Sequence, residues 1–206
     1  MAKRDLRAAA VVGTWRGMKA RRLFAGVRVE ATKALRELTA DLRRELRAER
    51  IRWDRLEQPH VTVWFFGETA AERIPELARA LRGAAAEVPA FTMAIGGPGV
   101  FGSARHPRVV WLGAEAGTGL RRLFDALAAR LRETGREPEA REFAPHLTLG
   151  RISELRDARR LAEALERRRG IVVQEQRVRE WILFESLLGP GGAQHVPLAT
   201  FPLRGA

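Results

Sequence analysis

The sequence predicts an α+β fold of two pseudo-symmetric lobes, in which largely antiparallel sheets face a central cleft and helices lie on the outside. Predicted strands often follow one another directly along the chain, which favours antiparallel sheet over a doubly wound parallel sheet. A short motif occurs twice, at residues 60–62 and 146–148, and indicates two related halves. No long linker divides the chain, so residues 21–206 are predicted to form a single bilobal domain.

Apolar residues three or four positions apart predict four helices. In the first helix leucines recur at this spacing from Leu35 to Leu46. Pro75 suits the first turn of the second helix, and Gly135 suits the end of the third. The four helices are expected at residues 31–47, 74–81, 120–131 and 155–165.

Short apolar or alternating runs between turn residues predict the strands. Gln58-Pro59 forms a turn before the third strand, and the segment GGPGVFGSARHP at residues 96–107 is predicted to be a Gly-rich loop. Strands are expected at residues 23–29, 51–53, 61–66, 91–95, 108–112, 143–149, 171–173, 181–184 and 201–203.

Residues 1–20 are predicted to be a basic N-terminal extension that is poorly ordered, because they show no hydrophobic period. Within them Met18 begins the segment MKARRLFAGV, which has the character of a domain start. The chain has no cysteine, so disulfides and thiolate metal sites are excluded. No apolar run approaches the roughly 18 residues that span a membrane, and a cytoplasmic protein without a membrane partner is expected.

The formal net charge of +12, from 37 Lys and Arg against 25 Asp and Glu, would attract a polyanion such as RNA. The abundance of Arg, Ala, Leu and Gly equally indicates a coding bias, so charge alone supports a nucleic-acid partner only weakly. The repeated motif is more informative about function.

That motif reads His60-Val61-Thr62 in one copy and His146-Leu147-Thr148 in the other. Side chains two positions apart in a strand point to the same face. Each strand would therefore present a histidine and a threonine on one face and apolar side chains on the other. Two such faces meeting at a cleft would bring together two imidazoles and two hydroxyls.

These groups suit displacement at phosphorus, which needs a base on the attacking oxygen and an acid on the leaving oxygen. Imidazoles, with an unperturbed pKa of about 6.5, can serve as both near neutral pH. Threonine hydroxyls can donate to the non-bridging oxygens. His60 and His146 are therefore the predicted catalytic residues, and Thr62, Thr148 and Arg151 are the predicted substrate-binding residues.

Other polar residues are weaker candidates. Arg151 could give phosphate a charge-assisted hydrogen bond, but its strand parity is opposite to that of His146 unless Gly150 turns the chain. Two histidines without cysteine or an acidic cluster leave too few ligands for zinc, so no metal site is predicted. His106 and His195 are predicted to be ordinary polar residues.

The segments RLFAGV, HVTVWFFG, GPGVFG, RVVWLG and FAPHLTLGR lie between about Arg22 and Leu203. The last is the most specific, because Phe-x-Pro precedes its histidine and an arginine follows. Together the segments resemble the 2H phosphoesterase superfamily and, within it, the RNA 2′,3′-cyclic phosphodiesterases, also called 2′-5′ RNA ligases.

The resemblance implies two lobes about a pseudo-twofold axis and hydrolysis of an RNA 2′,3′-cyclic phosphate to a 2′-phosphate, without metal or cofactor. It implies that His146 deprotonates the attacking water and that His60 protonates the departing 3′ oxygen. Thr62, Thr148 and Arg151 would hold the phosphate. Reversible 2′-5′ ligation would use a 5′-hydroxyl in place of water. The implied partner is RNA with a cyclic phosphate end, such as a tRNA half, and a monomer is expected.

The chain departs from the family where Trp64 and Phe65 replace a common basic residue and where His195 replaces a common tyrosine. Trp64 and Phe101 are predicted to pack in the core or at its rim rather than to stack on a base. Two alternatives remain open. One is action on small cyclic nucleotides, 2′-5′ oligonucleotides or cyclic ADP-ribose phosphate, and the other is RNA binding without catalysis.

Overall fold

The computed structural model describes residues 20–103, 106–133, 135, 142–189 and 192–206. Most of the extension that is predicted to be poorly ordered, residues 1–19, lies outside the described residues. Ala20 is exposed, and the first strand begins directly after it at Arg21.

The described residues combine α-helices with a sheet in which every pair of neighbouring strands is antiparallel. The predicted α+β class is therefore confirmed. The helices are α1 (Lys33–Glu45), the short 3-10 helix η1 (Ala71–Arg73), α2 (Ile74–Glu87), α3 (Gly119–Arg132) and α4 (Ala158–Glu166). The strands are β1 (Arg21–Arg28), β2 (Arg50–Trp53), β3 (His60–Thr69), β4 (Phe91–Gly102), β5 (Pro107–Glu115), β6 (His146–Glu154), β7 (Val172–Val178), β8 (Glu180–Gly189) and β9 (Gly192–Pro202).

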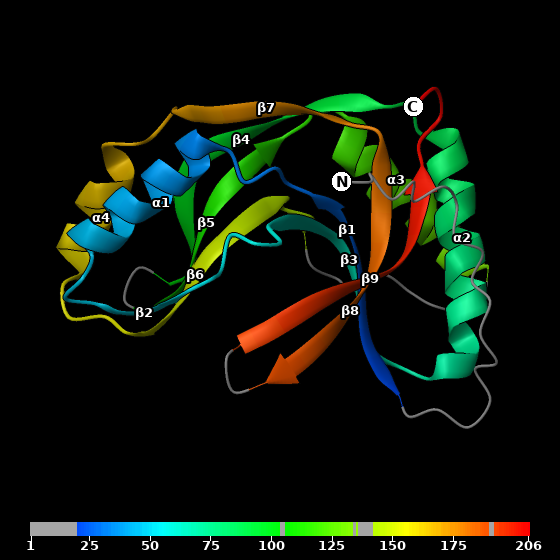
Figure 1. Cartoon of the computed structure of the whole chain (residues 1–206), viewed down its shortest axis with the longest axis horizontal. Helices are drawn as coiled ribbons and strands as arrows, with labels where there is room; N and C mark the ends of the chain where they lie inside the picture. Colours follow the sequence, from blue (N-terminus) through cyan, green and yellow to red (C-terminus); the bar gives the residue numbers. More distant parts are fainter. Residues whose placement is uncertain (1–19, 104–105, 134, 136–141, 190–191) are drawn as a thin grey trace, which may run out of the picture.

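All of these strands belong to one curled sheet, which Figure 1 shows. Their order is β7-β4-β5-β6-β3-β1-β8-β9. β2 lies outside this order and pairs with residues 150–154 of β6. The central strands β6 and β3 are joined through the pair Val61–Leu147. This junction divides the sheet into a β6 half, with β7, β4, β5, β6 and β2, and a β3 half, with β3, β1, β8 and β9.

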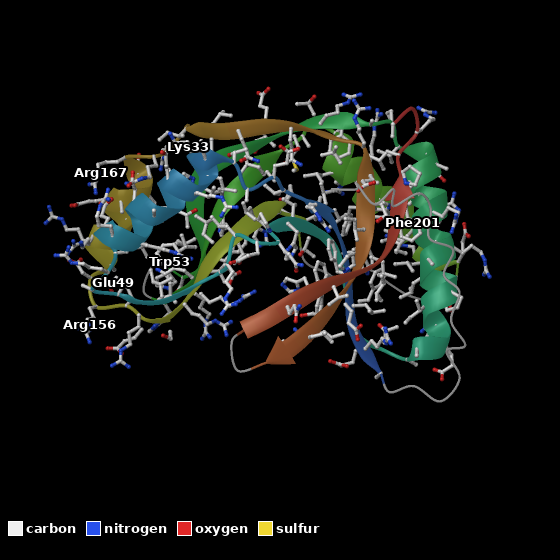
Figure 2. All side chains as sticks on the ribbon, viewed as in Figure 1. Lys33, Glu49, Trp53, Arg156, Arg167 and Phe201 are labelled. Atoms are coloured by element: carbon white, nitrogen blue, oxygen red, sulfur yellow. The ribbon has the colours of Figure 1, made fainter. Side chains whose placement is uncertain are left out.

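Each half of the sheet carries its own pair of helices (Figure 1). α2 and α3 pack against each other and against strands of the β3 half. α1 and α4 belong to the β6 half, where α1 contacts β7 and α4 contacts β4. Glu45 of α1 forms ion pairs with Arg167 and, at 2.9 Å, with Arg168. These ion pairs connect the residues that follow α4 to α1. Figure 2 shows Arg167 at the outer edge of the molecule.

The start of α1 and the side that it buries follow from its sequence. The Thr32 hydroxyl caps the helix, because it accepts a hydrogen bond from the backbone N–H of Leu35 at 3.3 Å. The same hydroxyl donates to the Gln174 side chain of β7 at 2.6 Å, which connects the helix start to the sheet. Leu35 and Leu42 are fully buried, as the leucine spacing predicts.

Residues 96–102 of the segment predicted to be a Gly-rich loop are instead the second part of β4, so the prediction is wrong for these residues. β4 continues to Gly102 and pairs with β5, with a bulge beside Pro98. Glycine is needed here because the strand passes close to a large ring. A Cβ on Gly99 would lie 2.4 Å from the Trp111 side chain. Glycine and proline mark bulged strands as well as loops, and the sequence pattern alone does not separate them.

The main hydrophobic core lies between the sheet and the helices. Phe201 of β9 is part of it, and Figure 2 shows this residue beside α2. Trp64 is buried with its ring centroid 5.1 Å from that of Phe124 in α3, so its predicted core packing is confirmed. In the described ranges, no helix combines the length and the apolar character needed to cross a membrane. A second, small cluster comprises Phe24, Ile182 and Phe184.

Candidate active site

The two copies of the motif meet at the junction between the halves of the sheet. Val61 and Leu147 are paired in antiparallel register, and both are buried in the main core. A local twofold axis through such a pair relates the two histidines to each other and the two threonines to each other. Side chains on either side of a core residue point to the opposite face, which we call the open face. The motif side chains on it are those of His60, Thr62, His146 and Thr148.

Each histidine ring is held by the same kind of backbone contact. Nδ1 of His60 lies 3.1 Å from the carbonyl oxygen of Gln58, and Nδ1 of His146 lies 2.8 Å from the carbonyl oxygen of Ala144. A carbonyl only accepts, so Nδ1 donates and Nε2 carries the free lone pair of the neutral ring. In both copies a proline with a restricted φ stands between the carbonyl and the histidine. Both neutral imidazoles therefore retain Nε2 for chemistry.

Arg151 also lies on the open face, although its strand parity predicts the opposite. Trp111 of β5 pairs with Thr148, but the next residue, Val110, pairs with Gly150. This bulge adds one residue to β6, so Arg151 lies opposite Val109 and on the same face as Thr148. The structure therefore brings all five predicted site residues to one face.

The curl of the sheet brings distant strands over this face. Neighbouring strands are about 4.8 Å apart, so β9 would lie about 14 Å from β3 in a flat sheet. The ring of His195 on β9 nevertheless approaches the ring of His60 on β3, with centroids 4.6 Å apart and an interplanar angle of 76°. The β3 half must therefore curve strongly around the histidine.

Aromatic rings line both imidazoles. Phe101 of β4 meets His146 edge-on, with centroids 4.6 Å apart at 84°, and Trp111 lies 6.4 Å from the same imidazole. On the other side Phe24 lies 4.8 Å from His60 and belongs to the small cluster described above. Phe101 thus contacts a predicted catalytic residue, a role that the sequence does not indicate.

His195 is the main residue that the sequence reasoning missed. The sequence predicts a terminal strand at residues 201–203 only and treats His195 as an ordinary polar residue, whereas β9 begins at Gly192 and carries His195 into the site. The one available signal is the replacement of a tyrosine that is common in the family. Among the described residues, no ring contact or hydrogen bond joins His106 to either motif histidine, and its backbone N–H donates to the Ser103 hydroxyl at 3.0 Å.

Burial controls the proton affinity of the site. It lowers the pKa of His60 to about 4, against the opposing effect of the Gln58 carbonyl and with smaller contributions from His195 and His146. Burial likewise lowers the pKa of His146, and the nearby charge of Arg151 acts in the same direction. Both rings are therefore neutral near neutral pH in the free protein.

One acidic residue lies close to these groups. The backbone N–H of Asp54, directly after β2, donates to the carbonyl of Leu149 at 2.8 Å. Burial raises the pKa of Asp54, and neighbouring Arg151 is the strongest of the cations that oppose this rise. No three His, Asp or Glu side chains of the described residues are grouped so that they could hold a metal ion.

A cavity of about 290 Å³ lies at the start of β5 and the end of β6, on the C-terminal side of Arg151. Its lining includes neither motif histidine. Its lining residues are His106, Pro107, Arg108, Ile152, Ser153, Glu154 and Leu155.

The fold and the paired His-x-Thr strands define a 2H phosphoesterase, an enzyme class named for its two histidines. The chain belongs to the 2′-5′ RNA ligase superfamily, whose sequence model matches residues 34–181. The site residues from His60 to Arg151 all fall within this matched region.

Named relatives and solved structures agree with this membership. A protein of Methanothermobacter thermautotrophicus named RNA 2′,3′-cyclic phosphodiesterase is 33% identical over 147 residues, covering 71% of this chain and 79% of the relative. A protein of the same name from Archaeoglobus fulgidus is 28% identical and covers 87% of this chain and 99% of the relative. A Thermus thermophilus crystal structure matches with a TM-score of 0.73 and 27% identity, over 89% of this chain and 98% of that chain. E. coli LigT in its apo form matches with a TM-score of 0.67 and 26% identity, over 91% and 99% of the two chains.

Proposed function

We propose that the protein hydrolyses RNA ends that carry a 2′,3′-cyclic phosphate to 2′-phosphomonoesters, with His60 and His146 as acid and base and without a metal ion. The carrying observation is the twofold relation at Val61–Leu147, which presents two imidazoles on one face of the sheet. The names of the relatives support the substrate class, and E. coli LigT forms a crystalline complex with 3′-AMP.

The proposed reaction transfers two protons. Nε2 of His146 accepts a proton from water while the water oxygen bonds to phosphorus opposite the 3′ oxygen. The bond between phosphorus and the 3′ oxygen breaks, and His60 donates its Nε2 proton to that oxygen. The phosphate remains on the 2′ oxygen. The backbone contacts at Nδ1 hold each ring in both protonation states, because a carbonyl accepts from Nδ1–H in either state.

His60 must be protonated when substrate is bound, although burial lowers its pKa to about 4 in the free protein. A phosphodiester anion next to an imidazole favours the charged ring. Substrate binding and proton uptake by His60 are therefore coupled in this proposal. His146 remains neutral and serves as the base.

The remaining motif residues bind the phosphate. Within the described part of the chain, the hydroxyls of Thr62 and Thr148 have no hydrogen-bond partner, and both lie on the open face with the histidines. They donate to the non-bridging oxygens, where negative charge concentrates during the reaction. Arg151 adds a charge-assisted hydrogen bond to the same oxygens.

The proposed partner is RNA with a cyclic phosphate end, including halves of a cleaved tRNA, and the net charge of +12 favours its binding. Reversible 2′-5′ ligation uses the same groups, with a 5′-hydroxyl in the position of the attacking water. We place the reaction in the cytoplasm and on a monomer.

A phosphodiesterase of small cyclic nucleotides or 2′-5′ oligonucleotides is the second candidate. It is favoured by the aromatic rings of Phe101 and Trp111, which lie 5.1 Å apart beside His146 and could stack on a single base. RNA binding without catalysis is the third, and in that case the protein would retain RNA in a gel and leave its end unchanged.

Hydrolysis of a short RNA with a 2′,3′-cyclic phosphate, in the presence of EDTA, tests the proposal. Wild-type protein should convert the end to a 2′-phosphate, and His60→Ala and His146→Ala should not. The same assay with 2′,3′-cyclic mononucleotides distinguishes the proposed function from the second candidate, which predicts faster hydrolysis of the mononucleotides than of the RNA. Loss of wild-type activity in EDTA would contradict the mechanism without a metal.

A further inference from the structure

His195 lies in the site but has no part in the mechanism above. It pairs with Ser186 across the β8–β9 ladder, and its ring stands edge-on to Phe24 with centroids 5.1 Å apart at 88°. Its second aromatic contact is His60, at 4.6 Å. Phe24 and His195 together form one wall around the His60 ring.

The Nδ1 atom of His195 is buried and has no hydrogen-bond partner among the described residues. An imidazolium needs acceptors for two N–H groups, and a buried donor without a partner costs roughly 1–3 kcal/mol. The environment of His195 therefore favours the neutral ring. A neutral imidazole packs against Phe24 and His60 as an aromatic side chain while it keeps the capacity to bind a proton.

The other motif histidine has a contact of the same geometry without this capacity. Phe101 meets His146 edge-on at 4.6 Å and 84°, and His195 meets His60 edge-on at 4.6 Å and 76°. The local twofold axis makes the two motifs equivalent in their backbones. Their side-chain neighbours break this equivalence. The neighbour of His146 is the phenyl ring of Phe101, whereas the neighbour of His60 is the imidazole of His195, which can bind a proton.

We propose that His195 is a positioning residue for His60: its neutral ring holds the His60 imidazole against Phe24, and when His195 is itself protonated its charge disfavours a proton on His60. The inference rests on the proposed function and deepens it, since it gives the two related histidines different neighbours. At this separation two charged imidazoles repel each other strongly in a partly buried site.

The surrounding charges agree with this role. His60 is faced by His195 and by His146, and the charge of each disfavours a proton on His60. His195 is faced from the β6 half by Asp54, which favours its charged form, and by Arg151, which disfavours it. Burial remains the largest influence on both rings, and the pKa of each lies below the ordinary value.

The His195→Phe variant removes the titratable group, keeps a ring, and reproduces the contact that Phe101 makes with His146. The chain has only four histidines, so their imidazole C2 protons can be followed separately by NMR titration of the full-length protein. We expect the His60 midpoint to move to higher pH in the variant and the His146 midpoint to stay. His106→Phe is the matched control and should move neither.

Kinetics of RNA cyclic-phosphate hydrolysis give the second readout. In His195→Phe, which keeps a ring beside His60, the pH dependence of kcat/KM should move in the same direction as the NMR midpoint. Its maximum should stay well above that of His60→Ala, for which a loss of roughly 10²–10⁴-fold is expected. His195→Gln, which is polar and uncharged, should show the same shift and serves if the phenylalanine variant unfolds. An unchanged His60 midpoint in both variants would overturn the inference. The NMR result is independent of turnover, so inactivity of wild type would refute the proposed function and leave this test standing.

Discussion

Val61 and Leu147 form the pair through which β3 joins β6, and each is followed by its threonine and preceded by its histidine. The distance between the two imidazoles therefore depends on a strand pairing whose own side chains are buried in the core. Both residues lie in the main core, where they are almost fully covered. Substitutions on the buried face of the sheet should consequently change the positions of the histidines on the open face.

Truncation of this contact tests that dependence. Leu147→Ala leaves a cavity in the core and should lower the free energy of unfolding by roughly 2–5 kcal/mol, measured by urea denaturation. The folded fraction of the variant should also lose kcat/KM, since His146 loses its anchor. Leu187→Ala, at an exposed position of β8, is the matched control and should change stability by no more than about 0.5 kcal/mol. Equal stabilities of the two variants would contradict the packing described here.

The two histidines should act as a unit. His60→Ala and His146→Ala should each lower kcat/KM for a cyclic-phosphate RNA by roughly 10²–10⁴-fold, and the double variant should lose little more than the worse single variant. Steady-state kinetics of the three variants check this expectation, with His106→Ala as a control of unchanged activity. Losses that simply multiply would show that the histidines do not act in one step.

The pH dependence follows from the lowered pKa values. Productive binding requires one protonated and one neutral imidazole, and in the free protein the pKa of His60 is about 4 and that of His146 lies below 6.5. kcat/KM, which reports the free protein, should therefore fall as the pH rises above about 6.5. kcat should have its optimum at higher pH, because bound phosphate favours protonated His60. A kcat/KM that increases steadily up to about pH 8 would contradict these assignments.

The bulge in β6 predicts a specific role for Arg151. Because the guanidinium lies on the open face, Arg151→Lys should remove a paired hydrogen bond to phosphate and lower kcat/KM by roughly tenfold to a hundredfold. Arg159→Lys, on the exposed face of α4, is the matched control. Equal activities of the two variants would place Arg151 in solvent.

Gly99 should be intolerant of a side chain. A Cβ would lie 2.4 Å from the Trp111 ring, so Gly99→Ala must displace that ring, which lies beside His146. We expect a destabilisation of roughly 1–3 kcal/mol, a changed tryptophan fluorescence and a higher KM. Gly189→Ala, where a Cβ would have its nearest contact at 3.8 Å, should leave all three unchanged. Normal fluorescence and KM in Gly99→Ala would refute the close contact.

The placement of the two motif histidines on one face was predictable from the sequence because its signal is local. Each His-x-Thr motif lies within one strand, and strand alternation alone places both polar side chains on one face. The leucine spacing of α1 is local in the same sense. These features need no knowledge of how strands are ordered in the sheet.

The missed features depend on longer-range geometry. The parity of Arg151 changes at a bulge that is defined by pairing with β5, and within β6 only Gly150 indicates that the chain could turn there. His195 reaches His60 only because the sheet curls over three strands. The glycines of β4 respond to the Trp111 ring, which comes from another strand. In each case the partner that determines the structure is remote in the sequence.

The local twofold axis has a consequence for the direction in which a nucleic acid would bind. Two motifs related by this axis do not distinguish the 5′ side of the nucleic acid from its 3′ side, because rotation by half a turn exchanges the two histidines. Polarity must therefore be read by what differs between the flanks, a phenylalanine and a tryptophan beside His146 and a phenylalanine and a histidine beside His60. Under the proposed function, a substrate turned end for end would meet the two histidines in reverse order and would have the other pair of aromatic side chains beside its base.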